Sequence, residues 1–329
     1  MGGDDNHPMP SPLPAPAPIE GAVPLADWGL IRASGADAAP FLHGQLTQDF
    51  AHLDLSRARL AGYCSAKGRL LASFVGWRRA GDEILLACSA DLLPATLKRL
   101  KMFVLRAKCQ LADAGPEIRL FGLCGATAER WLGAAAPAAV WGRSDLGEAQ
   151  VIRLPDAMAA GQPVARYLYA APTAEGEPDL PALDADPWRW LEVTSGVVRI
   201  VAATVEQFVP QMVNLELIGG VNFEKGCYPG QEVVARSQYR GTLKRRTVLF
   251  ETEATAAPGQ EVFADGDPSQ PAGLVANAAL RPGGGSAALV EVKLAALDAG
   301  GLHLGAADGP LLRRIDLPYP LPLPADEPA

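Results

Sequence analysis

The chain has 329 residues, of which 49% are hydrophobic and 20% are charged, and its net charge is −8. This length allows one large or two medium domains with a full core, and the acidic balance argues against a general nucleic-acid coat protein. Five cysteines without any Cys-x-x-Cys spacing fit neither a secreted disulfide framework nor a self-contained four-thiolate metal site. We therefore expect a reducing compartment, by default the cytoplasm.

The first 24 residues hold seven prolines among small and acidic residues, without a basic region followed by an apolar one. This composition predicts a disordered tail over residues 1–24, and neither a signal peptide nor a membrane anchor. No apolar run further along approaches the length of about 18 residues that spans a bilayer, so we expect no membrane partner.

Two similar α+β halves are predicted to follow within residues 25–245. Alternation and capping signals in the first half predict the following strands and helices: strands 28–33, 60–64, 70–78 and 83–88, a short helix opened by Asp37, and a helix 92–102 capped by Asp91. The second half is predicted to have a similar set of elements: strands 108–111, 118–123, 151–154 and 166–170, and a helix 126–132.

Residues 172–187 are rich in Pro, Asp and Glu and read as a solvated connection. It ends where Asp186 and Pro187 start a helix that carries Trp188. Beyond Arg246, short β-branched runs alternate with turn residues, which predicts a small antiparallel barrel over residues 246–320 and a tail over 321–329. Its predicted strands are 247–252, 261–264, 273–276, 287–292 and 312–317.

The densest chemistry lies in the octapeptide from Lys225 to Glu232, which reads Lys-Gly-Cys-Tyr-Pro-Gly-Gln-Glu. Its backbone-exposing residues should present Cys227 just ahead of a helix that begins near Gly230, where free N–H groups favour anions. That position and Lys225 should make Cys227 more reactive than a buried cysteine. A lone cysteine is usually a small buried hydrophobe, and the other four lie in apolar runs that indicate core: Cys64, Cys88, Cys109 and Cys124.

This octapeptide resembles the signature of the YgfZ family, folate-binding proteins related to the aminomethyltransferase of the glycine cleavage system. The family pattern is Lys-Gly-Cys-aromatic-x-Gly-Gln-Glu, so the motif residues besides Lys225 and Cys227 are Gly226, Tyr228, Gly230, Gln231 and Glu232. The resemblance extends from Leu25 to Tyr319. It implies an aminomethyltransferase-like folate-binding fold that ends in a barrel.

The resemblance also implies a folate site with Trp28 and Trp188 as contacts, since a flat indole suits stacking on a pterin. The alternative is that both are core anchors. Thr194 stands where the family has a glutamate, although Glu192 is nearby, which weakens the expected folate contact. Ala72 or Ser73 stands where the aminomethyltransferases have a catalytic aspartate, so the transferase activity is not carried over.

Several cations are candidates for facing an anion. Lys67 and Arg69, in a turn that resembles one of the family, could meet the tail of folate or a phosphate, or could simply be solvated. A cluster with no acid between residues 233 and 250 is predicted to form an anion-facing rim beside Cys227, or else a solvated face; its members are Arg236, Arg240, Lys244, Arg245 and Arg246. The scattered histidines predict no histidine metal site.

The leading functional expectation is an accessory protein, not an enzyme, that binds a reduced folate (tetrahydrofolate or a derivative). It would use Cys227 in assembly, insertion or repair of iron–sulfur clusters, including those of tRNA-modifying methylthiotransferases. A cluster needs four ligands, so any cluster on this single thiol would be shared and transient, and the chain should hold no metal of its own. It would meet tRNA only through client enzymes, and no DNA. The alternatives are a folate-dependent aminomethyl (one-carbon) transferase and a tRNA-binding module.

Overall fold

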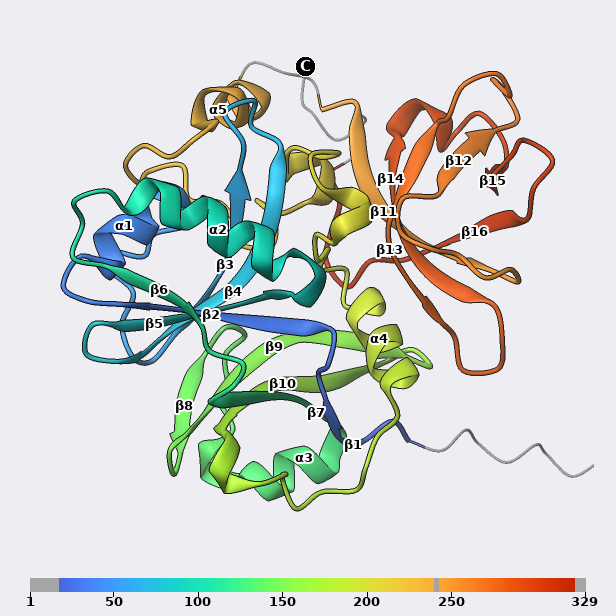
Figure 1. Cartoon of the computed structure of the whole chain (residues 1–329). Helices are drawn as coiled ribbons and strands as arrows, with labels where there is room; N and C mark the ends of the chain where they lie inside the picture. The colour runs from blue at the N-terminus through green and yellow to red at the C-terminus, as the bar shows by residue number, and fades with distance from the viewer. Residues whose placement is uncertain (1–17, 240–242, 323–329) are drawn as a thin grey trace, which may run out of the picture.

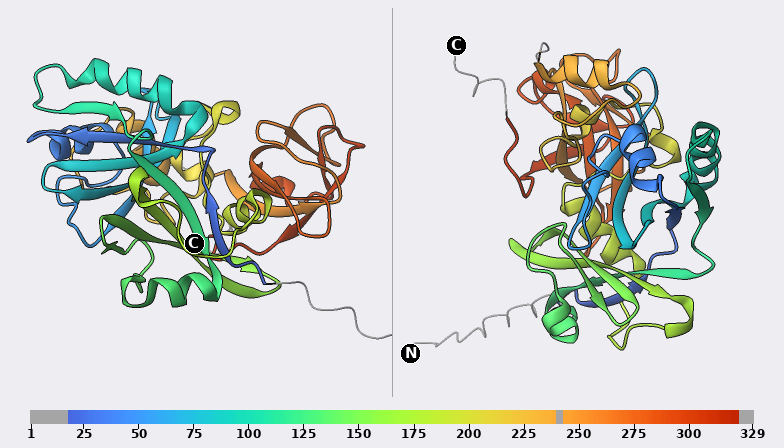
Figure 2. Two further views of the ribbon diagram at one scale, coloured as in Figure 1. Left: turned by 60° about the horizontal axis from the view of Figure 1, so that its bottom comes forward. Right: turned by 90° about the vertical axis from the view of Figure 1, so that its left-hand side faces the viewer.

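The computed structural model describes residues 18–239 and 243–322. Two five-stranded antiparallel sheets and a closed six-stranded barrel make up its three bodies, which surround a common centre (Figure 1). The left view of Figure 2 shows the barrel to one side of the two sheets. The predicted α+β fold with a C-terminal antiparallel barrel is thereby confirmed.

The first sheet has the strand order β3-β4-β5-β2-β6 and carries two helices. Its elements are β2 (Trp28–Ser34), α1 (Ala38–Gln45), β3 (Ala58–Cys64), β4 (Leu70–Ala80), β5 (Glu83–Ser89), α2 (Leu93–Val104) and β6 (Gln110–Asp113). Helix α2 turns Leu93, Thr96 and Leu100 inward at helical spacing. Strand β6 was expected in the second half, but it pairs with β2, because a four-residue pattern does not specify which sheet edge it joins.

The second sheet has the order β1-β7-β10-β9-β8. Its elements are β1 (Gly21–Pro24), β7 (Ile118–Cys124), α3 (Gly125–Leu132), β8 (Arg143–Leu146), β9 (Ala149–Ala159) and β10 (Gln162–Pro172). Strand β1 corrects the predicted tail of residues 1–24: it forms the edge of this sheet and pairs with β7, and Ala22 and Val23 are buried. Strand order is long-range information that four residues do not carry. Residues 1–17 of the predicted tail lie outside the described residues.

Helix α4 (Ala185–Thr194) follows the connection, which is largely exposed as expected. The N-cap residue is Asp184 and not the predicted Asp186. The helix therefore starts at Ala185, one residue before Asp186. In Figure 1 this helix lies between the second sheet and the barrel, and it packs on β9 and β13. All three bodies therefore meet near its C-terminal end.

The barrel closes in the order β11-β14-β13-β12-β15-β16. Its strands are β11 (Arg245–Thr252), β12 (Glu261–Ala264), β13 (Gly273–Leu280), β14 (Ser286–Lys293), β15 (Leu302–Leu304) and β16 (Leu311–Ile315). Val248, Val262 and Val290 are among the side chains that fill it. Sequence patterns did not predict the three-residue β15. Helix α5 (Gln231–Tyr239) precedes the barrel. Over the described ranges, no helix is long and apolar enough to cross a bilayer.

Candidate functional site

Cys227 is the exposed thiol of the chain, and the other four cysteines are buried. Burial raises the pKa of Cys64, Cys88 and Cys124 to about 12 and that of Cys109 to about 11. Those four thiols are therefore neutral and shielded near neutral pH. Cys227 lies in the loop before α5, where the sequence placed it, and it is the cysteine that a partner can reach.

Two glycines hold the loop of Cys227 against the hairpin turn between β3 and β4. Gly230 has a φ of +78°, and a Cβ there would lie 2.4 Å from the carbonyl oxygen of Ser65 and 2.6 Å from Cα of Gly68. Gly68 has a φ of +72°, and its Cβ would lie 2.8 Å from Cβ of Val233. Only glycine fits either position. The two motifs, some 160 residues apart in sequence, therefore form one structural unit.

Lys225 tethers the other end of the loop. The side chain is 9% exposed, and Nζ donates to the carbonyl oxygens of His43, at 2.6 Å, and Gly226, at 3.0 Å. Nζ also lies 4.7 Å from the ring centroid of the buried Tyr228. Burial lowers the pKa of Lys225 to about 8, although Asp49 and Cys227 oppose that shift. Its ammonium is therefore used to fix the loop to the end of α1.

The rest of the motif surrounds this anchor. Burial raises the pKa of Tyr228, so its phenol stays neutral. Gly226 lies beside His43, with 3.4 Å between Nε2 and a Cβ built on the glycine. Gln231 opens α5, and Glu232 is exposed on its first turn. The motif therefore divides into buried residues that brace the loop and exposed ones around Cys227.

The histidines are not as scattered as their spacing indicated. Nδ1 of His43 lies 2.9 Å from Oδ1 of Asp49, and Nδ1 of His52 lies 2.8 Å from Oδ2 of the same carboxylate. Burial alone would raise the pKa of Asp49, but hydrogen bonds from His52 and His43 lower it to about 2. No group of three or more His, Cys, Asp or Glu side chains within residues 18–239 and 243–322 is placed to hold a metal ion.

A cavity lies where the two sheets, α4 and the barrel meet, and it offers about 80 Å³ to water-sized molecules. Its walls come from β2, β4, β9, β10, α4 and β13. The side chains that matter here are Trp28, Trp141, Arg166, Arg189, Glu192, Arg199 and Asn277. It has room for several water molecules or one end of a larger ligand.

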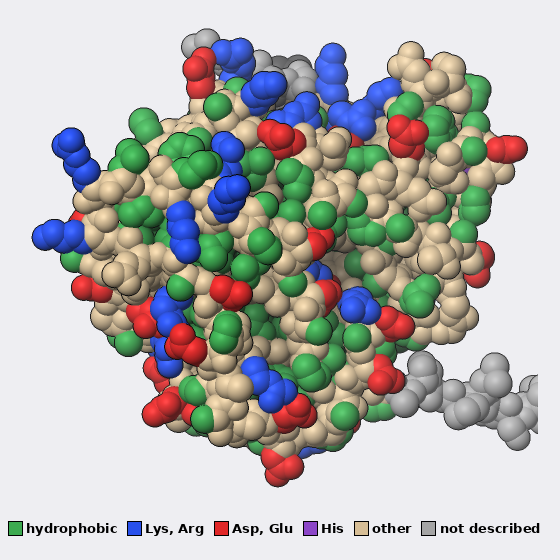
Figure 3. Space-filling model, viewed as in Figure 1, with side chains coloured by type: hydrophobic (Ala, Val, Ile, Leu, Met, Phe, Trp, Pro, Cys, Tyr) green, Lys and Arg blue, Asp and Glu red, His purple; other side chains and the backbone are tan. Residues whose placement is uncertain are grey.

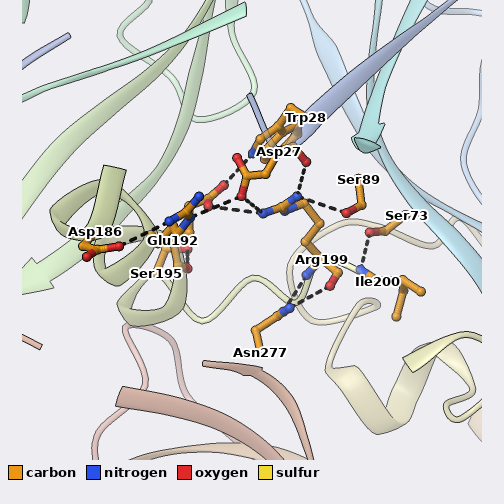
Figure 4. A network of polar contacts seen from close by, with 11 residues as sticks. Asp27, Trp28, Ser73, Ser89, Asp186, Glu192, Ser195, Arg199, Ile200 and Asn277 are labelled. Atoms are coloured by element: carbon orange, nitrogen blue, oxygen red, sulfur yellow. Dashed lines mark hydrogen bonds and ion pairs between the residues drawn. The ribbon is translucent and has the colours of Figure 1, made fainter. Parts of the chain in front are cut away.

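A polar network built around Arg199 organises this cavity (Figure 4). Its guanidinium donates to Oδ2 of Asp27 at 2.9 Å, lies 3.5 Å from Oε2 of Glu192, and covers the ring of Trp28 at 4.9 Å. Trp28 Nε1 donates to Oε1 of Glu192 at 2.9 Å. Burial raises the pKa of Glu192, while Arg199 opposes that shift. A half-buried carboxylate, two indole rings and several cations thus converge on one small space.

Trp28 lines this cavity, whereas Trp188, the second predicted folate contact, does not. Trp188 is 1% exposed and packs on Gly122 of β7, where a Cβ would lie 2.5 Å from the indole. The guanidinium of Arg166 covers its ring at 5.5 Å. Gly122 has no side chain, and the indole of Trp188 fills the space that this leaves on the sheet, so Trp188 is a core residue. The sequence around Trp188 does not show this, because Gly122 lies on another element.

The chain has no carboxylate at the two positions where the related proteins have one, Thr194 and Ala72 or Ser73. Thr194 is 2% exposed, and its hydroxyl donates to the carbonyl oxygen of Trp190 at 3.0 Å. Ser73 accepts a hydrogen bond from the backbone N–H of Ile200 at 3.0 Å, and Ala72 is buried. Glu192 is the carboxylate present instead. Sequence reasoning noted Glu192 but missed Arg199, Arg166 and Asn277, because these come from separate elements and share no motif.

The predicted anion-facing rim is not present as such. Arg246 is 4% exposed, pairs with the buried Glu216, and donates to the carbonyl oxygen of Gln211 at 2.9 Å. Arg245 donates to Glu291 at 2.7 Å, and Arg236 pairs with Glu232 at 2.9 Å. The pairing acids lie mostly in other parts of the chain, so the local absence of acids was misleading.

The remaining predicted cations differ in their surroundings. Lys244 and Lys67 are exposed, and Arg69 donates to the carbonyl oxygen of Gln207. Arg240 lies outside the described residues. Among the described residues, Lys67 and Lys244 are thus the predicted cations that are exposed and have no carboxylate partner within 4 Å.

Comparison with known proteins adds the following. No family model matches the chain. The tRNA-modifying protein YgfZ of Edwardsiella ictaluri (strain 93-146) is 34% identical over 255 residues, which cover 71% of this chain and 72% of that protein. The tRNA-modifying protein YgfZ of Serratia proteamaculans (strain 568) is 31% identical over 245 residues, 72% of each chain.

Among solved structures, the glycine cleavage system aminomethyltransferase T from Bartonella henselae matches with a TM-score of 0.66. The match covers 91% of this chain and 86% of that one at 17% identity. At this identity the likeness shows the fold alone.

Proposed function

The chain belongs to the YgfZ family, and from that premise we propose that it is a folate-binding accessory protein that acts through the thiol of Cys227. Relatives carry the name tRNA-modifying protein. The proposed contribution of this chain lies one step earlier, in the cytoplasm. It supports assembly, insertion or repair of iron–sulfur clusters in enzymes that modify tRNA, methylthiotransferases included.

The observation that carries the proposal is the contrast between Cys227 and its setting. The thiol is exposed, whereas the loop that carries it is braced by Lys225 at one end and by Gly230 at the other. A thiolate can bind a cluster iron or exchange with a partner's sulfur, but a cluster needs four ligands. The partner would supply the rest, because the other four thiols are buried and no group of three or more possible ligands lies together among the described residues.

Folate fits the central cavity by the chemistry of its donor set. The amino and ring N–H groups of a pterin require an acceptor, and Glu192 keeps lone pairs beyond those used by Trp28 and Arg199. Trp28 and Trp141 would flank the ring, and Arg189, 45% exposed, would meet the carboxylates of the tail outside. When bound, folate would supply one-carbon chemistry or a signal of folate status.

The competing functions are less well supported. A one-carbon transferase needs a positioned acid/base group worth a factor of about 10² to 10⁴, and Ala72, Ser73 and Thr194 do not supply one. A tRNA-binding module that uses residues 236–246 loses its basis, because Arg236, Arg245 and Arg246 are paired with carboxylates.

The thiol is tested by complementation. Cells that lack the protein receive wild type, Cys227→Ala or the matched control Cys109→Ala, and methylthio-modified nucleosides in tRNA are measured by mass spectrometry. We expect wild type and Cys109→Ala to restore modification and Cys227→Ala to fail, with similar protein levels. Full restoration by Cys227→Ala would mean that the thiol is not the functional group.

The cavity is tested by fluorescence. Titration with tetrahydrofolate should quench tryptophan emission of wild type, and Glu192→Gln should weaken the apparent affinity by a factor on the order of 10 to 100, the value of a charge-assisted hydrogen bond. Trp131→Phe, on α3 away from the cavity, is the control and should leave the affinity unchanged. Equal affinities of wild type and Glu192→Gln would remove the cavity as the folate site.

A further inference from the structure

The second half of α2 and the turn after it present cations that the proposed function does not use. No acidic residue occurs between residues 92 and 112, and five basic residues lie there: Lys98, Arg99, Lys101, Arg106 and Lys108. Four of these are exposed, and Arg99 is half-buried. None of the five side-chain charges has a carboxylate oxygen of the described residues within 4 Å, although the backbone N–H of Lys108 donates to Oδ2 of Asp37 at 2.6 Å. We call this set the α2 basic surface.

Large apolar side chains lie among these cations. Met102 is 58% exposed, Phe103 43% and Leu105 86%, which is three of the nine large hydrophobic side chains classed as exposed in the described part of the chain. The guanidinium of Arg99 lies 5.8 Å from the ring centroid of Phe103, one helical turn away. Figure 3 shows Lys and Arg side chains gathered among hydrophobic ones over α2. Such mixed exposure indicates an interaction surface.

The end of α2 also carries backbone strain. Leu105 is the residue that caps the helix, with φ of 46° and ψ of −103°, a conformation in which glycine is usual. Its side chain is almost fully exposed, so burial in the fold does not compensate for the strain. The helix dipole favours one or two cations at a C-terminus. It accounts neither for five cations nor for the apolar side chains between them.

We propose that the α2 basic surface docks RNA, with phosphates against its cations and an unpaired base against Phe103. Lys98, Lys101 and Met102 lie on one side of α2, because Lys101 and Met102 follow Lys98 by three and four residues. The two lysines can therefore contact phosphates along one RNA strand. An exposed aromatic ring with a guanidinium on its face is a platform on which bases stack. Unpaired bases in loops are the part of RNA that proteins read in this way.

An acidic protein is the other partner with the right charge, and the composition of the surface favours RNA. Lysine is depleted in protein–protein interfaces, whereas three of the five cations here are lysines. Charge neutralisation by flexible cations is the main source of affinity for phosphate backbones. This surface involves neither Cys227 nor the central cavity, so the inference does not rest on the proposed function. It assigns RNA contact to a different surface from the predicted residues 236–246.

The test uses the full chain and a fluorescently labelled RNA stem-loop, with binding followed by anisotropy over a range of salt concentrations. The variant Lys98→Ala/Lys101→Ala/Arg106→Ala should bind at least tenfold more weakly, and its log–log salt slope should be smaller by about 2, at roughly 0.7 per lost contact. The control Arg236→Ala/Lys244→Ala/Arg314→Ala removes the same charge from α5, from the residue before β11 and from Arg314, which is exposed on β16. It should leave both quantities near wild type.

Two further measurements identify the partner. Phe103→Leu should keep the salt slope but lose the preference for the stem-loop over a fully paired duplex, by a factor on the order of 10. Poly-glutamate should compete poorly with the RNA at equal charge. Equal losses in the two triple variants, or no measurable binding of RNA by wild type, would overturn the proposal. Competition by poly-glutamate as effective as by RNA would also overturn it, in favour of an acidic protein partner.

Discussion

Residues 98–108 and 236–246 look alike in sequence and differ in space. Each stretch has five cations and no acid. In the first, all five cations lack a carboxylate within 4 Å among the described residues, and four are exposed. In the second, Arg236, Arg245 and Arg246 are each paired. Residues 236–246, which were predicted to face an anion, are therefore mostly paired with carboxylates. Residues 98–108, for which no function was predicted, keep their charges unpaired and mostly exposed.

The difference comes from how many neighbours each stretch has. Strand β11 begins at Arg245 and lies between β14 and β16, so Glu291 of β14 reaches Arg245 from the adjacent strand. Glu216 reaches Arg246 from the segment that leads to Cys227. Helix α2 is an outer layer with one face uncovered, so its outer cations have no neighbour to pair with. Charge along a chain therefore predicts surface charge only where the element has a free face.

Among the variants that test this comparison, Arg246→Ala should have the largest effect on stability. Its pair with Glu216 has both side chains 5% exposed, and removal of one partner leaves a buried unpaired charge. Arg246→Ala should lower the free energy of unfolding by about 3 to 5 kcal/mol, measured by urea denaturation. The double variant Arg246→Met/Glu216→Leu should recover most of that loss, since it removes both charges. A loss below about 1 kcal/mol would mean that Arg246 can reach solvent and an external anion.

The contrast also shows which parts of the fold the sequence could supply. Strands such as β2, β5 and β12 and helix α3 follow from local alternation and spacing, and their predicted bounds lie within a residue of those observed. Pairing order is not local, so β6 was assigned to the wrong half and β1 was taken for tail. Short strands such as β8 and β15 have too few residues to show a period.

The same limit applies to the site. The exposure of Cys227 was predictable, because glycine and proline mark its loop within a few residues. The pairing of Gly230 with Gly68, the hydrogen bond between Trp28 and Glu192, and the covering of Trp28 by Arg199 join elements that no spacing rule connects. The packing of Trp188 could not be predicted for the same reason, since its indole occupies the space that Gly122 leaves free.

Lys225 is a third kind of cation, one that is buried but donates hydrogen bonds to carbonyl oxygens and has no carboxylate partner among the described residues. Its pKa is lowered to about 8 by burial, so between about pH 8 and 10.5 the unfolded chain holds a proton that the folded chain has released. Stability should therefore rise with pH across that window and be flat below it. The unfolding free energy of wild type relative to Lys225→Met should increase by at most about 3 kcal/mol. A difference that falls with pH would mean that a carboxylate pairs with Lys225 in solution.

A smaller effect is expected at Leu105, on the open stretch. Its left-handed backbone costs on the order of 1 kcal/mol, and its side chain is 86% exposed and contributes little burial. Leu105→Gly should raise the melting temperature, with a gain of about 0.5 to 1 kcal/mol. It should also weaken RNA binding if the side chain contacts the ligand. Val104→Gly, in the last turn of α2, is the control and should destabilise the protein instead.

The smallest effect distinguishes the exposed cations of the two stretches by its sign. Lys98 and Lys101 are both exposed, carry like charges three residues apart, and have no carboxylate within 4 Å among the described residues. Lys98 lies in the middle of α2, away from the last turn where the helix dipole favours a cation, so Lys98→Ala should change stability by no more than about 0.5 kcal/mol and in the stabilising direction at low salt. Arg236 pairs with Glu232 at 2.9 Å on α5, so Arg236→Ala should lose about 0.3 to 0.5 kcal/mol under the same conditions. Both differences should vanish at high salt, because exposed charges are screened within a few ångströms there. Urea denaturation at two salt concentrations measures both. A destabilising Lys98→Ala would mean that this lysine has a carboxylate partner in solution and that the α2 basic surface is less open than its geometry indicates.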